Sequence, residues 1–148
     1  MGSWNLVPGL NHVGAYQVSG QPFASGSINC KLDDVPLSDC EVAFPYVTRW
    51  FKVINNDVSN DCKVAFSISG LTGSKNYFTV AARSGSISTA YGSTSNAATD
   101  SGVLELKVSS IWVSGSTNVD VVAGLTKVPQ HLTATPTGAN WSGSSGVG

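Results

Sequence analysis

The strongest signal for the fold is the stretch Cys62-Lys63-Val64-Ala65-Phe66-Ser67-Ile68-Ser69. Apolar and polar residues alternate along it, which is the pattern of a β-strand with one buried face. Because successive side chains of a strand point to opposite faces, we expect Cys62, Val64, Phe66 and Ile68 to face a core and the residues between them to face outward.

Similar patterns predict strands in most of the remaining chain. Residues 47–54 carry apolar side chains on both faces around Arg49 and Lys52, which is typical of a central strand or of one whose outer face meets a partner. Residues 104–108 alternate cleanly, and the phase then slips at 109–110, where we expect a β-bulge. Weaker strand patterns lie at 13–18, 28–32, 41–44, 77–81 and 118–122.

Turn-forming residues separate these stretches. Residues 55–61 form a polar run of Asn and Asp that is typical of a hairpin loop, and residues 69–74 and 114–116 are turns rich in Gly and Ser. No stretch has a helical stripe of apolar residues. Strands about ten residues apart therefore predict an all-β fold, a single antiparallel β-sandwich or jelly-roll-like domain. Residues 84–102 lack alternation and are long for a hairpin, as functional loops often are.

The chain has 148 residues, which is enough for one hydrophobic core and too little for two. We expect an extended N-terminal arm at residues 1–26, the β-sandwich at 27–128 and an extended C-terminal arm at 129–148. Both arms are punctuated by small residues and proline, yet each contains large apolar side chains that could act as anchors on a neighbour.

Charge is scarce in this chain. Charged residues make up 11% of it and the formal net charge is −1, so no basic stripe exists to neutralise phosphates and we expect no nucleic-acid partner. No apolar run approaches the roughly 20 residues that cross a bilayer, so we expect no membrane partner. A surface in which Ser, Thr, Asn and Gly replace charge suits contact with other proteins.

The sequence offers little catalytic chemistry. His12 and His131 have neither a nucleophile nor an acidic cluster beside them, so neither a triad nor a zinc site is indicated. Oxygen donors gather at residues 55–61, but Asn and Asp are also ordinary turn formers, and we favour that interpretation. The three cysteines lack C-x-x-C spacing, and we expect reduced thiols. We therefore expect no enzymatic activity, no cofactor and no metal.

The aromatic residues fall into two groups. Because neighbours in a strand face opposite ways, one member of Trp50-Phe51 and one of Tyr77-Phe78 should face outward. We expect Phe51, Phe66 and Phe78 in the core. For Trp50, Tyr77 and Trp112, a core position and an interface position remain equally open. Exposed aromatics could stack on sugar rings or contact protein, and the neutral surface favours a protein partner.

Five short stretches of the sequence, called phrases below, carry a resemblance to a known class of proteins. They are residues 14–23 (GAYQVSGQPF), 44–50 (FPYVTRW), 76–78 (NYF), 108–115 (VSSIWVSG) and 121–126 (VVAGLT). In these phrases the chain resembles small virion structural proteins of tailed phages, notably cyanophages, and of related aquatic double-stranded DNA viruses. The resemblance covers about residues 14–128. It implies a capsid decoration, cement or minor capsid protein, with a β-sandwich or jelly roll in symmetric copies and arms that reach neighbours, and it implies no catalytic residues.

The resemblance leads to an expected function. The chain would bind and stabilise the capsid shell of a virion assembled in the host cytoplasm, with the major capsid protein, other virion proteins and further copies of itself as partners, a trimer being favoured. The alternative is a glycan-binding module of a phage tail or fibre that uses exposed aromatics. The expected partner-binding residues, from the arms and the exposed aromatics, are Trp4, Leu6, Leu10, Trp50, Tyr77, Trp112 and Trp141.

Overall fold

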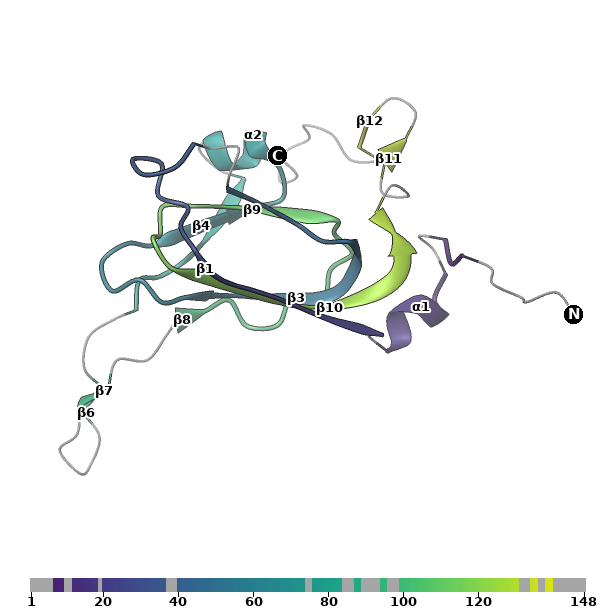
Figure 1. Cartoon of the computed structure of the whole chain (residues 1–148), viewed down its shortest axis with the longest axis horizontal. Helices are drawn as coiled ribbons and strands as arrows, with labels where there is room; N and C mark the ends of the chain where they lie inside the picture. Colours follow the sequence, from purple (N-terminus) through teal and green to yellow (C-terminus); the bar gives the residue numbers. More distant parts are fainter. Residues whose placement is uncertain are drawn as a thin grey trace, which may run out of the picture.

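Two four-stranded antiparallel sheets pack face to face in the computed structural model (Figure 1). The structure describes residues 7–9, 12–18, 20–36, 40–73, 76–83, 87–88, 94–95, 99–130, 134–135 and 138–139. The predicted all-β sandwich is therefore confirmed.

Sheet A forms the lower layer in Figure 1 and sheet B the upper layer. Sheet A has the order β1 (Gln21–Ile28), β10 (Val119–Pro129), β3 (Tyr46–Asn55) and β8 (Thr99–Asp100). Sheet B has the order β2 (Glu41–Ala43), β9 (Ser110–Ser114), β4 (Cys62–Ala65) and β5 (Tyr77–Val80). The short elements are α1 (Gly14–Gln17), α2 (Ile68–Thr72), the ribbon β6 (Ile87–Ser88) with β7 (Thr94–Ser95), and the ribbon β11 (Ala134–Thr135) with β12 (Gly138–Ala139).

The core lies between the two sheets and contains a line of aromatic rings. Successive ring centroids of Phe23, Phe44, Phe51, Phe66 and Phe78 lie 5.0 to 6.4 Å apart. Phe51 is fully buried, as predicted, whereas Phe66 and Phe78, also predicted in the core, are partly buried and pack against it. Valines of β3, β4, β9 and β10 fill the space around the rings, because their alternate positions face the opposite sheet.

The polar run at residues 55–61 is not a hairpin loop, contrary to the prediction. It carries the chain from β3 in sheet A to β4 in sheet B. The carboxylate of Asp57 accepts hydrogen bonds from the backbone N–H groups of Ser59, Asn60 and Thr117, from the amide of Asn60 and from the hydroxyl of Thr117. These hydrogen bonds occupy the Asp57 carboxylate. Residues 55–61 are therefore better described as a turn than as a cation site.

Four other details of the predicted strands are wrong. The strand at 62–69 ends at Ala65, and Ile68 is 44% exposed in α2 rather than in the core. Residues 14–17 within the expected strand 13–18 are helical. Both helices have four or five residues, which is too short for a periodic stripe. Residues 21–26, expected in the N-terminal arm, pair with β10 as part of β1.

The fourth error concerns the predicted strand at 104–108. Within it only Leu104 forms a β-bridge, to Phe51, and further along the Thr48 hydroxyl donates to the carbonyl of Leu106 and accepts from the N–H of Val108. The phase slip expected as a bulge marks the point where the chain leaves sheet A and enters β9 of sheet B. Most of the expected loop at 84–102 lies outside the described residues. None of the helices in the described part of the chain is long and apolar enough to span a bilayer.

Candidate interaction surface

The outer face of sheet A carries a set of apolar side chains that the strand register places side by side. Gly124 of β10 lies opposite both Pro22 of β1 and Trp50 of β3. Two residues earlier on β10, Val122 lies opposite Ala24 of β1 and Lys52 of β3. We call this surface the apolar face. It comprises Pro22, Ala24, Trp50, Ile54, Val103 and Val122, of which Val103 is 59% exposed.

A local irregularity of β3 shapes this face beside Trp50. Trp50 pairs with Gly124 and Thr48 pairs with Leu125, so Arg49 is an extra residue on β3 with no counterpart on β10. Such a bulge re-aims the side chains next to it. The Arg49 guanidinium reaches the carbonyl oxygen of Tyr16 at 2.6 Å and the carboxylate of Glu105 at 3.6 Å. The bulge therefore lets a core strand present Arg49 at the border of the apolar face.

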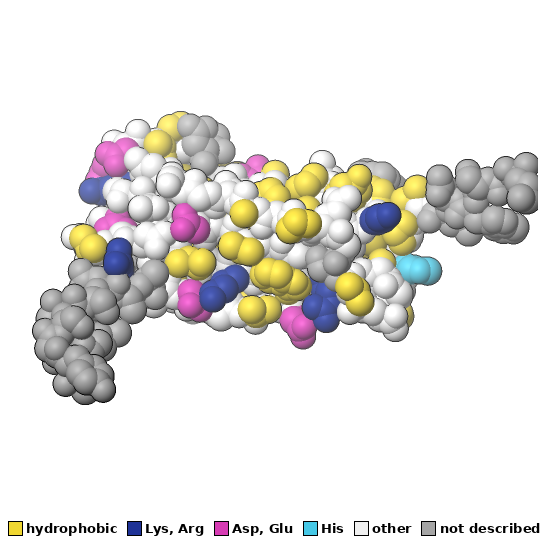
Figure 2. All heavy atoms as spheres, turned by 60° about the horizontal axis from the view of Figure 1, so that its bottom comes forward, with side chains coloured by type: hydrophobic (Ala, Val, Ile, Leu, Met, Phe, Trp, Pro, Cys, Tyr) yellow, Lys and Arg dark blue, Asp and Glu magenta, His cyan; other side chains and the backbone are white. Residues whose placement is uncertain are grey.

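The charged side chains at this border are matched by partners from the same chain. Lys52 lies 3.3 Å from Asp100, and Arg49 is paired with Glu105. Asp120 accepts hydrogen bonds from the backbone of Ser27 at 2.9 Å and from the amide of Asn56 at 2.7 Å. Figure 2 shows this underside of the molecule, with hydrophobic side chains gathered in the middle, some basic and acidic side chains adjacent to one another and others standing alone. The two ion pairs carry no net charge, whereas Asp120, whose two hydrogen-bond donors are neutral, keeps its negative charge.

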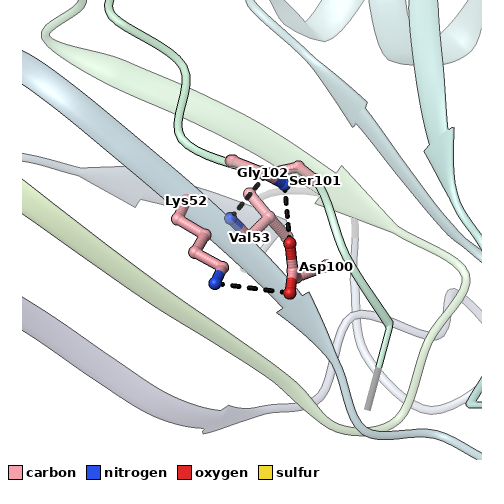
Figure 3. A network of polar contacts seen from close by, with 5 residues as sticks. All are labelled: Lys52, Val53, Asp100, Ser101 and Gly102. Atoms are coloured by element: carbon pink, nitrogen blue, oxygen red, sulfur yellow. Dashed lines mark hydrogen bonds and ion pairs between the residues drawn. The ribbon is translucent and has the colours of Figure 1, made fainter. Parts of the chain in front are cut away.

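The segment after β8 is fastened to β3 by a small polar network (Figure 3). Asp100 accepts from the N–H of Gly102 at 2.7 Å, and this bond, followed by the one from Lys52, lowers the pKa of the Asp100 carboxyl. Ser101 accepts from the N–H of Val53 at 3.0 Å and donates its own N–H to the carbonyl of Val53 at 2.9 Å. These bonds hold the segment along the edge of β3, and so they position Val103 and Lys52 on the apolar face.

Trp50 lies on the outer face of sheet A and not between the two sheets, so it does not belong to the core that the sheets enclose. Its side chain is half-buried, and Gly124 directly opposite is buried. The interface position of Trp50 stays a prediction.

Tyr77 and Trp112 lie on the opposite side of the molecule, on the outer face of sheet B. Both pair with Ala65, and the ammonium of Lys63 lies 4.7 Å from the centroid of the Tyr77 ring. Helix α2 packs over Ala65, which is fully buried, so that a Cβ on Gly70 would lie 3.3 Å from the Ala65 methyl. The two half-buried aromatic residues therefore flank the position at which α2 packs on sheet B. The structure does not bring them together with Trp50 in one site.

The remaining predicted anchors, Trp4, Leu6, Leu10 and Trp141, lie outside the described residues, as does His131. His12 lines an open hollow of about 340 Å³ beside α1, together with Pro8, Ala15 and Lys127. Within the described ranges, no group of three or more His, Cys, Asp or Glu side chains is arranged to hold a metal ion.

The three cysteines form no disulfide and are fully buried. Cys30 donates its S–H to the carbonyl of Ser116 at 3.2 Å. The hydrogen bond between Cys30 and Cys62 lowers the pKa of the Cys30 thiol and, with burial, raises that of Cys62. Because all three side chains lie in the core cluster, they pack there as small side chains.

Sequence reasoning identified Trp50 but missed Pro22, Ala24 and Val122. Their signal lies in the sequence of β10, where Val121, Val122 and Ala123 place apolar side chains on both faces of one strand. Comparison with known proteins adds nothing to this geometry, because no family model, no curated protein and no solved structure matches the chain.

Proposed function

We propose that this chain is a virion structural protein of the decoration or cement type and that its sandwich is a jelly roll. The observation that carries the proposal is the pairing of the eight sandwich strands. The first pairs with the last, the second with the second-last, and so on inward: β1 with β10, β2 with β9, β3 with β8 and β4 with β5. This nesting is that of one long hairpin wrapped into two sheets, the connectivity of jelly rolls in viral capsid and lectin domains.

Two further features support a structural role in a shell. Five phrases of the sequence resemble virion proteins, and they contribute to β1, β3, β5, β9 and β10 of the sandwich. The chain also has a low charge and an apolar face, which suit permanent contact with protein. A cement protein strengthens a shell by burying area across its seams, and a stable contact needs about 800 Å² per partner. The predicted arm anchors Trp4, Leu6, Leu10 and Trp141, which lie outside the described residues, would add area of this kind.

A second candidate is a glycan-binding module of a tail or fibre. It is favoured by the same connectivity, which lectins share, and by the outward indole of Trp50. It is the weaker candidate because Tyr77 and Trp112 flank α2 on the other side of the molecule, which leaves Trp50 without a second aromatic on its face among the described strands of sheet A.

The proposal is tested on particles purified from infected cells that express the chain. We expect the chain to remain with the particles through a density gradient in a fixed ratio to the major capsid protein, and the purified chain to bind shells from which it has been stripped. The Trp4→Ala, Trp141→Ala double variant should lose this binding, whereas Val58→Ser, at a solvent-exposed loop position, should keep it. Absence from purified particles, together with saturable retention on a polysaccharide, would favour the glycan module instead.

A further inference from the structure

We infer that residues 12–18, which include α1, form a strap that detaches from sheet A as a unit while the sandwich stays folded. Arg49 and Lys107 hold this strap in its docked position. Detachment would turn the N-terminal segment into a free arm and uncover the end of β10. The inference goes beyond the proposed function, because it concerns the isolated chain and requires no shell.

The strap has little stability of its own. Helix α1 has four residues, none of them buried, and no side-chain hydrogen bond at its N-terminus. A helix of this length is not stable by itself in water. Val13 and Val18, near the two ends of the strap, are 72% and 77% exposed. The strap therefore depends on the contacts that it makes with the sandwich, beside the end of β10 (Figure 1).

Two basic side chains hold the strap through Tyr16. The Arg49 guanidinium donates to the carbonyl oxygen of Tyr16 at 2.6 Å, and the ammonium of Lys107 lies 4.3 Å from the centroid of the Tyr16 ring. Both contacts lie at a partly exposed surface, so each contributes modestly to docking. Beyond the strap, the N–H of Gly20 donates to the carbonyl of Leu125 at 3.0 Å, just before β1 begins to pair with β10. This bond marks the point about which the strap can move.

The docked position is imperfect in two respects. The hydroxyl of Tyr16 is buried without a hydrogen-bond partner among the described residues, and burial raises the pKa of this phenol above its ordinary value. Burying a hydroxyl without a partner costs free energy, which is recovered when water reaches the group. In addition, an open hollow of about 340 Å³ separates strap residues such as His12 and Ala15 from Lys127 of β10. The strap therefore does not pack tightly on the sheet.

The detached state keeps the charge of Arg49 matched. Besides the Tyr16 carbonyl, the Arg49 guanidinium has the carboxylate of Glu105 at 3.6 Å, and this ion pair involves no residue of the strap. The hydroxyl of Tyr16 would gain water in the same step. The docked and detached states therefore differ by few contacts, which is the property of segments that open locally while the rest of a fold stays intact.

The test is the rate at which chymotrypsin cleaves the full-length chain after residue 16. When opening and closing are fast, this rate follows the population of the detached strap. Arg49→Ala should raise the rate about tenfold and Lys107→Ala about threefold, because each removes one of the holding contacts. Lys63→Ala is the matched control for Lys107→Ala. Lys63 lies 4.7 Å from the centroid of the Tyr77 ring on sheet B, and its loss should leave the rate unchanged.

Tyr16→Phe gives the sharpest result, because it removes the hydroxyl without a partner and keeps an aromatic ring for chymotrypsin. It should slow cleavage about fivefold, after correction by the cleavage rates of free peptides of residues 7–25. Three outcomes would each overturn the inference: cleavage of the unchanged chain as fast as that of the free peptide, cleavage only where urea unfolds the sandwich, or faster cleavage of Tyr16→Phe. Because no shell is present, they are separate from the particle experiment, which alone tests the proposed function.

Discussion

At the scale of single residues, the corner between the two sheets depends on Asp57. This side chain is 6% exposed, and its carboxylate accepts bonds from three residues of two different loops. The bonds from the hydroxyl and the N–H of Thr117 are the main reason that the pKa of the Asp57 carboxyl lies well below its usual range. The charge is therefore part of the folded structure, because donors from both loops converge on the ionised carboxylate.

The first prediction concerns Asp57→Asn. We expect it to lower the free energy of unfolding at neutral pH by about 2 kcal/mol, since a neutral amide is a weaker acceptor for these donors. The folded-state pKa lies below the roughly 3.9 of an unfolded Asp. The stabilisation is therefore fully present above that value and is lost as the pH falls below it. The difference between the two proteins in urea unfolding should shrink from pH 5 to pH 2.

Asp33→Asn is the matched control, because Asp33 is exposed in a loop. It should change the unfolding free energy by less than about 0.5 kcal/mol. A difference between Asp57→Asn and the unchanged protein that stays constant down to pH 2 would contradict the assigned role of the charge.

The second prediction compares two glycines with left-handed backbone angles. Gly115 has φ of 101° and a Cβ there would lie 2.7 Å from the carbonyl oxygen of Asp61, whereas Gly102 has φ of 71° and nothing within 4 Å. We expect Gly115→Ala to cost about 3 kcal/mol and Gly102→Ala about 1 kcal/mol, because only the first adds a clash to the backbone strain. Thermal unfolding of the two variants checks this order, and equal costs would contradict it.

At the scale of elements, the segment 62–72 shows how one strand pattern can be cut short. The alternation of β4 continues past Ala65, yet the chain turns into α2, where the Ser67 hydroxyl accepts the N–H of Gly70 at 2.9 Å. A serine side chain that caps a helix competes with the sheet for the same backbone. This helix then covers Ala65 between Tyr77 and Trp112. The Ser67 cap therefore also determines that a helix packs between these two aromatic residues.

The third prediction follows from this cap. Ser67→Ala should lower the free energy of unfolding by about 1 kcal/mol, because the first turn of α2 loses its acceptor. Ser69→Ala, inside the same helix, should have an effect near zero, since alanine is the better helix former there. Urea unfolding and the fluorescence of Trp112 would both report the change. Equal effects of the two substitutions would mean that the cap does not hold α2.

At the scale of the whole molecule, the two outer faces of the sandwich differ. Helix α2 covers Ala65 on the outer face of sheet B, whereas the outer face of sheet A carries the apolar face with Trp50 and has α1 beside β10 (Figure 1). The proposed cement function uses the apolar face, because a cement protein needs a surface on which copies or shell subunits can meet (Figure 2).

The fold class could be predicted because strand alternation is a local property. Phe51 was correctly assigned to the core, and Phe66 and Phe78, also predicted there, pack against it while partly buried. Of the two interpretations left open for residues 47–54, the structure shows β3 between β10 and β8, as a central strand requires. The boundaries failed where a distant partner decides them. Residues 21–26 carry little alternation of their own and join the sheet only because β10 lies beside them. The candidate surface was predicted only at Trp50, because its other members are small residues without a signal of their own.

By itself, the sequence determined that this chain is an all-β sandwich with little charge, since the period of its apolar residues and its composition require nothing from distant contacts. Only the tertiary structure decided which sheet each strand joins, that Tyr77 and Trp112 flank the alanine on which α2 packs, and that Trp50 shares a face with Val122 and Ala24. The physical reason is that the alternation that favours a strand depends on residues adjacent in the chain. A surface, in contrast, is made by strands that come together from distant parts of the chain.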